Sequence, residues 1–360
     1  MVNLERAAER LNSLSAYRAL KPRNLALQKR RRYRSSRLQE IKVRSKVSHD
    51  MAEPSEERTF KSYTPVLAKA YATSRGSYHE NLFKIILDTH RSTGGAMKVL
   101  LDVGCGPGNS TRPLAKHFGS AFGIDPSPEM INTAKSISIE NPEETSTGES
   151  ITFCVGRAED MKVSFRKPGQ EVDLLTSGTA AHWFDMPQFW SSAAACLKPG
   201  ATVALWTTSS SYCHPSTPNA AKVQEAMLRL GRENIAPYEL PGNRVARDSY
   251  DDLLLPWNCN PPVDGFLESG FTRLEWDRDG KLSNPEHFFL GDEIVTIERM
   301  KERLGTSSMV TRWREAHPQL AGTEKDVVIK VAREMREVLE GDEFVVGRSC
   351  VLLLLKKTGA

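Results

Sequence analysis

The sequence predicts an α/β protein built on a mostly parallel sheet that is covered by helices. Between residues 97 and 207, short apolar runs alternate with segments of helical periodicity. These runs are apolar on both faces, which is typical of buried parallel strands. A glycine-rich turn follows the first of them, as a strand-to-helix connection in such a sheet requires.

Five strands and four helices are predicted in and beside this alternating part. The strands are expected at 97–104, 121–125, 150–156, 171–177 and 201–207. The helices are expected at 77–90, 110–118, 127–140 and 185–200. Ser77 followed by Glu80 predicts a capping box at the start of the first helix. Ser127 and Asp185 are expected to cap the third and fourth helices, each with a proline close behind.

After residue 207 the alternation stops. Two stretches, 208–262 and 285–340, are expected to form a mainly helical insertion that shapes or covers a substrate pocket. A cofactor-binding core is expected at 77–207, and closing strands are expected later in the chain, at 268–276 and 343–356. The sequence therefore predicts a helical cap before the last strand of the sheet.

Residues 1–58 form a basic arm that we expect to be disordered. Residues 1–50 hold 14 Lys and Arg against 4 Asp and Glu, whereas the rest of the chain holds 35 basic and 41 acidic residues. The run QKRRRYRSSR is typical of a nucleic-acid or nuclear-localisation patch, and also of a mitochondrial presequence. A third interpretation is that the native chain starts at Met51. The expected domain at 59–360 is mildly acidic, so it does not favour nucleic acid as a partner.

The sequence argues against a membrane span and against a metal site. No stretch approaches 18 consecutive apolar residues, so we expect no membrane span. The six cysteines are scattered without metal-ligand spacing, which favours free thiols and no metal. We expect a cytoplasmic monomer or homodimer, or a mitochondrial protein if the arm is a presequence.

The stretch LLDVGCGPGNS places three glycines, Gly104, Gly106 and Gly108, directly after the first strand. A phosphate-binding P-loop would need a lysine after them, and none follows. A dinucleotide fingerprint would need a glycine where the chain has Asn109 or Thr111. Two interpretations remain: a nucleoside-binding loop, or a tight turn that binds nothing.

Asp125 favours the first interpretation. It ends the second predicted strand, 17 residues after Gly108, where its carboxylate can accept hydrogen bonds from both hydroxyls of a ribose. A ligand without a pyrophosphate does not need the third glycine of the dinucleotide fingerprint. An adenosine ligand with a methionine tail, S-adenosylmethionine, therefore fits better than a dinucleotide.

These motifs resemble those of the class I S-adenosylmethionine-dependent methyltransferases. LLDVGCGPG is similar to their first motif, GIDPSPEM to the second, GRAEDM to the adenine-binding segment and LKPG to the turn before their fifth strand. The order and spacing also agree. The resemblance implies a Rossmann-like seven-stranded sheet, an enzyme, and S-adenosylmethionine as its cofactor.

A narrower resemblance, over most of residues 60–350, is to the trans-aconitate methyltransferase family and its fungal small-molecule relatives. The segments YATSRGSYH, AAHWFD and PYELPGNR carry it. The chain departs from that family where Gly76 and His79 replace prolines and where Arg244 is displaced by one position. Arg157 stands where many methyltransferases have an acid. These departures concern the substrate and the adenine contact.

The resemblance implies roles for cofactor-binding residues. Asp102 would orient the glycine loop or meet the amino group of the methionine tail, Ala158 would offer its backbone N–H to adenine, and Arg75 would pair with the methionine carboxylate. The full set is Asp102, Gly104, Cys105, Gly106, Gly108, Asp125, Pro126, Met130, Ala158, Glu159, Ser177, Tyr71 and Arg75.

The candidate catalytic residues are His182, as a general base, and Trp183, as a wall of the pocket. Tyr78, Trp183 and Arg244 are the candidate substrate-binding residues, with Arg244 as a clamp for a carboxylate. Each has a plainer interpretation: a structural histidine, a core tryptophan, a surface arginine in a loop.

The predicted function is O-methylation of a small metabolite at a carboxylate or a hydroxyl, and the family resemblance suggests fungal specialised metabolism. A carboxylate is ionised at pH 7 and needs no general base, whereas a hydroxyl would benefit from one. The alternatives are a non-catalytic S-adenosylmethionine-binding or partner protein and, on the basic arm alone, a nucleic-acid methyltransferase.

Overall fold

The computed structural model describes residues 68, 72, 77–161 and 171–359. All of them belong to one structural unit, which spans residues 55–360. The predicted arm at 1–58 and the predicted cofactor residues Tyr71 and Arg75 lie outside the described residues.

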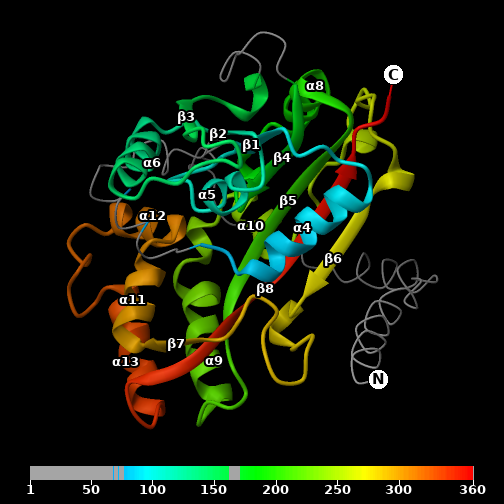
Figure 1. Ribbon diagram of the computed structural model, residues 1–360. Coiled ribbons are helices and arrows are strands. Elements are labelled where there is room, and N and C mark those ends of the chain that lie inside the picture. The colour runs from blue at the N-terminus through cyan, green and yellow to red at the C-terminus, as the bar shows by residue number, and fades with distance from the viewer. Residues whose placement is uncertain (1–67, 69–71, 73–76, 162–170, 360) are drawn as a thin grey trace, which may run out of the picture. The chain divides into compact units, whose positions relative to one another are not determined.

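The centre of the described chain is one mixed sheet (Figure 1). Its strands are β1 (Val99–Val103), β2 (Ser120–Asp125), β3 (Thr152–Val155), β4 (Val172–Gly178), β5 (Leu197–Cys213), β6 (Thr272–Trp276), β7 (Glu293–Thr296) and β8 (Glu343–Lys356). Their order is β3-β2-β1-β4-β5-β8-β6, and β7 also pairs with β8. The first five strands in this order are parallel, and β8 runs antiparallel to its neighbours β5 and β6. The predicted mostly parallel α/β sheet is confirmed, with eight strands in the described residues where seven were predicted.

Helices cover both faces of this sheet. One face packs against α4 (Glu80–Ser92), α5 (Thr111–Ala115) and α6 (Pro128–Glu140), which contribute buried side chains such as Phe83, Leu114 and Ile131. The other face packs against α8 (Met186–Cys196) through Phe189 and Trp190. Because both faces are buried at the centre of the sheet, β1, β2 and β4 are mainly apolar, which is why they could be predicted from the sequence.

Two of the three predicted helix caps are confirmed. Ser127 Oγ accepts from Met130 N at 3.4 Å, and Asp185 Oδ1 accepts from Gln188 N at 3.1 Å. The predicted capping box of the first helix is wrong, because the N-cap of α4 is His79. The Ser77 hydroxyl donates instead to Asn109 O, 3.0 Å away in the glycine turn. The Ser77 hydroxyl therefore bonds a residue 32 positions later in the chain and does not cap the helix.

The helix α8 ends at Cys196, earlier than predicted, and the chain is already part of β5 from Leu197 onward. Pro199 explains the difference, because a proline has no N–H for the helix and disfavours helical backbone in the residue before it. Gly200 then turns the chain with a φ of +82°.

β5 and β8 extend well beyond the rest of the sheet. Their register shifts between Thr208 and Ser211, and past this irregularity β7 joins the free side of β8. The helices α9 (Ala220–Arg229), α11 (Ile297–Gly305) and α13 (Val327–Val338) gather at this end (Figure 1). They share a hydrophobic core with the strand extension that includes Val223, Met300 and Val331. The predicted helical insertion is therefore mounted on a long two-stranded ribbon.

Two further α-helices, α10 (Pro241–Arg247) and α12 (Ser308–Ala316), belong to the part of the chain that follows β5.

Within the described residues, no helix is both long enough and apolar enough to cross a membrane.

Candidate functional site

The three glycines form a tight turn between β1 and α5. Their φ values are +67° at Gly104, +55° at Gly106 and +87° at Gly108, which L side chains rarely adopt. A Cβ atom on Gly104 would lie 2.6 Å from the Cβ of Ala180, so only a glycine fits there. The N–H groups of Gly104 and Cys105 both donate to Ile124 O, at 2.8 and 3.0 Å, which ties the turn to the end of β2.

Asp102 supports this turn from behind. Its carboxylate is fully buried and accepts hydrogen bonds from three hydroxyls, those of Ser110, Thr111 and Thr176, at 2.6 to 2.8 Å. Burial raises the pKa of Asp102, and the three hydroxyl groups oppose that shift. Of the two predicted roles, the geometry favours orienting the glycine loop over meeting the methionine tail.

Asp125 lies at the other side of the turn, at the end of β2. Its Oδ2 accepts from Gly106 N at 3.0 Å and its Oδ1 accepts from Ser127 N at 2.9 Å. Each carboxylate oxygen has two lone pairs, so each can accept one more hydrogen bond. Burial raises the pKa of Asp125 to about 6. The carboxylate is therefore held in place by backbone N–H groups and still able to accept from a ligand.

A cavity of about 630 Å³ opens between this turn and the segment after β4. That volume is within the range of about 300–1,000 Å³ that is usual for small-molecule sites. Ten of the predicted site residues line it: Tyr78, Gly104, Cys105, Gly106, Asp125, Pro126, Met130, Ala158, Glu159 and Trp183.

At one end of the cavity, Ala158 and Glu159 begin the short helix η1 (Ala158–Asp160). The Glu159 carboxylate accepts from Asp185 N at 3.1 Å and pairs with Arg157 at 3.3 Å. Arg157, which stands where many methyltransferases have an acid, lines the cavity together with Glu159. An ion pair between Arg157 and Glu159 therefore lies beside the predicted adenine position.

Several predicted site residues do not line the cavity. Gly108 is buried within the turn, where its N–H donates to Cys105 O at 3.0 Å. Ser177 is fully buried in β4, with no hydrogen-bond partner for its hydroxyl among the described residues. Asp102 is buried behind the turn, as described above.

His182, the predicted general base, lies behind the cavity wall. It belongs to the short helix η2 (Ala181–Trp183), and its Nδ1 lies 3.1 Å from the hydroxyl of Tyr250. Its ring packs on Trp183, with ring centroids 4.8 Å apart. Burial lowers the pKa of His182 to about 3. The geometry does not favour the predicted catalytic base, because His182 does not line the cavity and its Nδ1 lies beside the Tyr250 hydroxyl. Its ring supports Trp183, which does line the cavity.

Arg244, the predicted carboxylate clamp, is an exposed residue of α10. Its Nε donates to Glu239 at 3.3 Å, and it does not line the cavity. The prediction is corrected because the helix that carries Arg244 meets the wall through another residue. A Cβ atom on Gly242 would lie 2.5 Å from the Trp183 ring, so α10 packs on the back of that ring.

The far end of the cavity is built by residues that the sequence did not single out. Arg303 of α11 is buried, with 7% of its surface exposed. Its Nη2 donates to both carboxylate oxygens of Glu293, at 2.6 and 2.8 Å. Its Nε has no hydrogen-bond partner among the described residues. Asp292 and Arg348 line the same end. These residues belong to an irregular segment, a helix and the strand β8, and no local pattern links them.

The residues around the turn fit S-adenosylmethionine. Asp125 offers an acceptor to a ribose at the end of β2, and Ala158 stands where the resemblance places adenine. Gly104 and Gly106 line the cavity without a side chain. Within the described residues, no cluster of three or more His, Cys, Asp or Glu side chains could hold a metal ion. All six cysteines are free thiols.

Comparisons with known proteins agree with this geometry. Residues 101–205 match the family described as a methyltransferase domain. A methyltransferase from Dictyostelium discoideum is 30% identical over 188 residues, which cover 52% of this chain and 63% of that protein. Methyltransferase cfoB of Aspergillus candidus is 28% identical over 320 residues, which cover 82% of this chain and 96% of the relative.

Among solved structures, a type II methyltransferase from Anaeromyxobacter dehalogenans is similar with a TM-score of 0.53 and 23% identity. The match covers 79% of this chain and 97% of that chain, and it supports the fold. The fold, the glycine turn with Asp125 and the matched domain lead to one family. Residues 101–205 therefore form a methyltransferase domain, and the residues around its glycine turn fit S-adenosylmethionine.

Proposed function

We propose that this protein transfers a methyl group to an oxygen atom of a small metabolite, and that the oxygen belongs to a carboxylate. The observation that carries the proposal is a single cavity that is lined by Asp125 at one end and by the buried Arg303 at the other. When bound, S-adenosylmethionine supplies an already activated methyl group, so the chain has mainly to hold the two reactants in line.

The buried cation Arg303 supports an acceptor in the substrate, because its side chain lines the cavity. A hydrogen bond from a charged group to a ligand oxygen is worth about 1.5–3 kcal/mol. Glu293 already uses the Nη2 of the same guanidinium. We therefore assign Arg303 to the binding of an oxygen-rich group of the substrate, in place of Arg244.

Among the described residues, each group at this end that could act as a general base already has a hydrogen-bond or ion-pair partner. His79 Nδ1 accepts from Asn81 N, Glu293 pairs with Arg303, and Asp292 accepts from His287 and from Phe288 N. A hydroxyl would benefit from a free base, by about 10²- to 10⁴-fold in rate, whereas a carboxylate would not need one. This difference favours an ester product over an ether.

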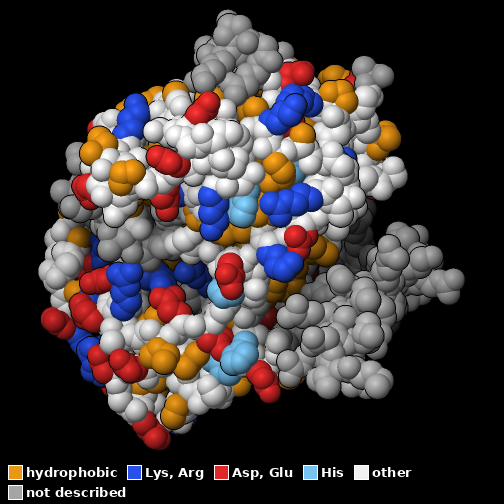
Figure 2. Space-filling view, viewed as in Figure 1, with side chains coloured by type: hydrophobic (Ala, Val, Ile, Leu, Met, Phe, Trp, Pro, Cys, Tyr) orange, Lys and Arg blue, Asp and Glu red, His pale blue; other side chains and the backbone are white. Residues whose placement is uncertain are grey.

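A small molecule is favoured over a nucleic acid. On the face shown in Figure 2, basic and acidic side chains are interspersed, and no broad surface of one sign is visible. The fungal origin of the relative that overlaps most of the chain supports the expectation of fungal specialised metabolism.

The test is a methyl-transfer screen with radiolabelled S-adenosylmethionine over small carboxylic acids and matched phenols. We expect transfer to acids, with a product that alkali hydrolyses. A product stable to alkali, formed only from phenols, would contradict the carboxylate assignment. Calorimetry with S-adenosylhomocysteine separates the alternatives, because binding without transfer to any acceptor would favour a non-catalytic binding protein.

A further inference from the structure

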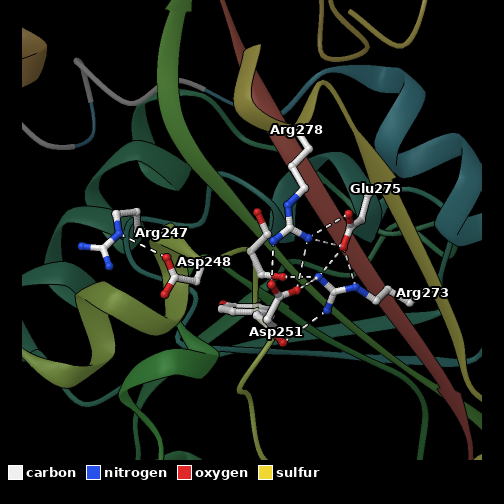
Figure 3. Close-up of polar contacts among 8 residues, drawn as sticks. Arg247, Asp248, Asp251, Arg273, Glu275 and Arg278 are labelled. Carbon is white, nitrogen blue, oxygen red and sulfur yellow. Dashed lines mark hydrogen bonds and ion pairs between the residues drawn. The ribbon is translucent and has the colours of Figure 1, made fainter. Parts of the chain in front are cut away.

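Outside the cavity, four charged side chains form a network that we call the clasp: Asp251, Arg273, Glu275 and Arg278. The Asp251 carboxylate lies between the two arginines and accepts from Arg273 Nη2 at 2.8 Å and from Arg278 Nη2 at 2.6 Å. Glu275 pairs with both arginines, at 2.6 Å from Arg273 Nε and 3.1 Å from Arg278 Nη1. Figure 3 shows this arrangement, with Arg247 and Asp248 paired separately.

The clasp joins three segments: the turn after α10, the strand β6 and the short helix η7 (Arg278–Gly280). Two of these segments are strained. Six non-glycine residues of the described chain have a positive φ, and four of them flank the clasp: Ser249 at +55°, Tyr250 at +60°, Asp277 at +55° and Asp279 at +57°. Residues in this region of φ persist only where surrounding contacts hold them, and such strain gathers at functional sites.

Arg273 holds the first strained turn directly. Its Nη2 donates to Ser249 O at 2.6 Å and its Nη1 donates to Tyr250 O at 3.2 Å. The flat guanidinium, with its several fixed donors, can bond both carbonyls and Asp251 at once, which a lysine cannot do. The conformation of Tyr250 therefore depends on the clasp.

Tyr250 in turn reaches the cavity wall. Its side chain is buried, and its hydroxyl lies 3.1 Å from His182 Nδ1 and 3.4 Å from Trp206 O. Trp206 O also accepts from Thr179 N at 2.7 Å. Both Thr179 and Trp183, the neighbour on which the His182 ring packs, line the cavity. One hydroxyl thus supports two parts of the same wall.

The second strained turn reaches another part of the wall. The buried carboxylate of Asp277 accepts from Ser283 N at 2.7 Å and from Phe289 N at 2.6 Å. The next residues, Leu290 to Glu293, line the far end of the cavity. Arg278, the clasp residue between the strained Asp277 and Asp279, is held by Asp251 and Glu275.

We infer that the clasp is a positioning device for the methyl-transfer site: it holds two strained turns, which set Trp183 on one side and the 290–293 segment on the other. This inference rests on the proposed function only in assigning these walls to donor and acceptor. The clasp residues are positioning residues, because none of them lines the cavity. Ion pairs between side chains that are 25–44% exposed contribute little to stability, so we expect changes in the clasp to alter the cavity more than the melting temperature.

The test uses three conservative variants of the full chain: Asp251→Asn, Arg273→Lys and Tyr250→Phe. Each removes hydrogen bonds in the path from the clasp to the wall, and one such bond corresponds to about a fivefold change in an equilibrium constant. We expect the Kd for S-adenosylhomocysteine and the KM for donor to rise about fivefold, with a smaller change in kcat. Asp251→Asn, which affects both turns, is expected to raise the KM for the acceptor as well.

Two matched controls come from the helical region. Tyr238→Phe removes the hydroxyl of a second tyrosine–histidine pair, whose hydroxyl lies 3.4 Å from His317 Nδ1 away from the cavity. Arg229→Gln removes an exposed ion pair with Glu334. Both controls are expected to keep the Kd and both KM values of the wild type.

A spectroscopic readout decides the inference without any ligand. In protein labelled with 5-fluorotryptophan, the ¹⁹F resonance of Trp183 is identified by its loss in Trp183→Phe. We expect this resonance to shift in the two clasp variants and in Tyr250→Phe, and to stay in place in the two controls, while the resonance of Trp313 does not move in the clasp variants or in Tyr250→Phe. Clasp variants that lower the melting temperature but leave the Trp183 resonance and the Kd unchanged would overturn the inference. Failure of the wild type to bind S-adenosylhomocysteine would count against the proposed function alone.

Discussion

The two ends of the cavity are built in different ways. The donor end is formed by the turns that follow β1, β2 and β4, and its contacts are largely backbone N–H groups and glycines placed at the carboxyl ends of parallel strands. The far end is formed by side chains such as Arg303, from the helix α11, and Arg348, from β8, which is one strand of the long ribbon. The donor end is thus determined by the sheet itself, and the far end by whatever is packed against it.

This difference teaches which end can change. A turn held by backbone geometry tolerates few substitutions, whereas an end lined by side chains can be altered one residue at a time. The helices at the far end share a hydrophobic core with the extended ends of β5 and β8, and this core is distinct from the two cores on the faces of the main sheet. We therefore expect changes at the acceptor site to leave the donor end of the sheet in place. The predictions below test this separation, from the largest expected effect to the smallest.

Gly104→Val should damage the donor end most. The new Cβ would lie 2.6 Å from Ala180, and valine would have to adopt a φ of +67°. We expect a loss of at least about 3 kcal/mol in the free energy of unfolding, together with loss of donor binding, because strain and overpacking add. Urea unfolding and calorimetry measure both quantities. Gly200→Ala is the control, since its φ is +82° but nothing lies within 4 Å of the added Cβ, and a cost near that of Gly104→Val would contradict the steric argument.

Asp125→Ala should weaken donor binding without unfolding the protein. The ribose hydroxyls would lose a charged acceptor, worth about 1.5–3 kcal/mol, which is about a 10- to 150-fold rise in Kd. Calorimetry with S-adenosylhomocysteine measures this. An unchanged Kd would show that the ribose does not bind at the end of β2.

Arg303→Gln should affect only the far end. Loss of its charged hydrogen bond to the substrate is expected to raise the KM for the acceptor by about tenfold or more, since such bonds are worth about 1.5–3 kcal/mol. The Kd for S-adenosylhomocysteine should stay the same. Arg333→Gln, which removes an exposed pair with Glu324, is the control. A weaker donor complex in Arg303→Gln would mean that the two ends are not separate.

Donor affinity should depend on pH through Asp125. Its pKa is raised to about 6, and the ionised carboxylate is the stronger acceptor for ribose hydroxyls. Affinity should therefore rise as the pH increases through 6 and then level off, and at pH 5 it should be lower by up to about tenfold, because only about a tenth of the carboxylate is ionised. Titration calorimetry at several pH values measures this, and Asp125→Asn should give a flat profile.

Arg244→Gln should have the smallest effect. Because Arg244 is exposed and pairs with Glu239 outside the cavity, we expect both KM values to stay within about twofold of the wild type and stability to change by less than about 0.5 kcal/mol. Steady-state kinetics measure the outcome. A large rise in the KM for the acceptor would restore Arg244 as the substrate clamp and weaken the assignment of Arg303.

Much of the sheet and of the donor end could be predicted because the signals are local. Buried parallel strands are apolar on both faces, Ser127 and Asp185 cap the helices that directly follow them, and the glycine turn lies beside its own strand. The predictions failed where a residue from a distant segment offered another hydrogen-bond partner. Ser77 has the pattern of a helix cap, but Asn109 takes its hydrogen bond.

The sequence by itself determined the order of strands and helices, the glycine turn and the carboxylate at the end of β2. These depend on residues close together in the chain, whose backbone preferences act within one or two turns of structure. Only the tertiary structure decided that His182 supports a wall through Tyr250, that Arg303 lines the cavity and that β5 and β8 extend into a ribbon. Those features depend on contacts between segments far apart in the chain, where burial and hydrogen-bond partners are set by packing and leave no periodic pattern in the sequence.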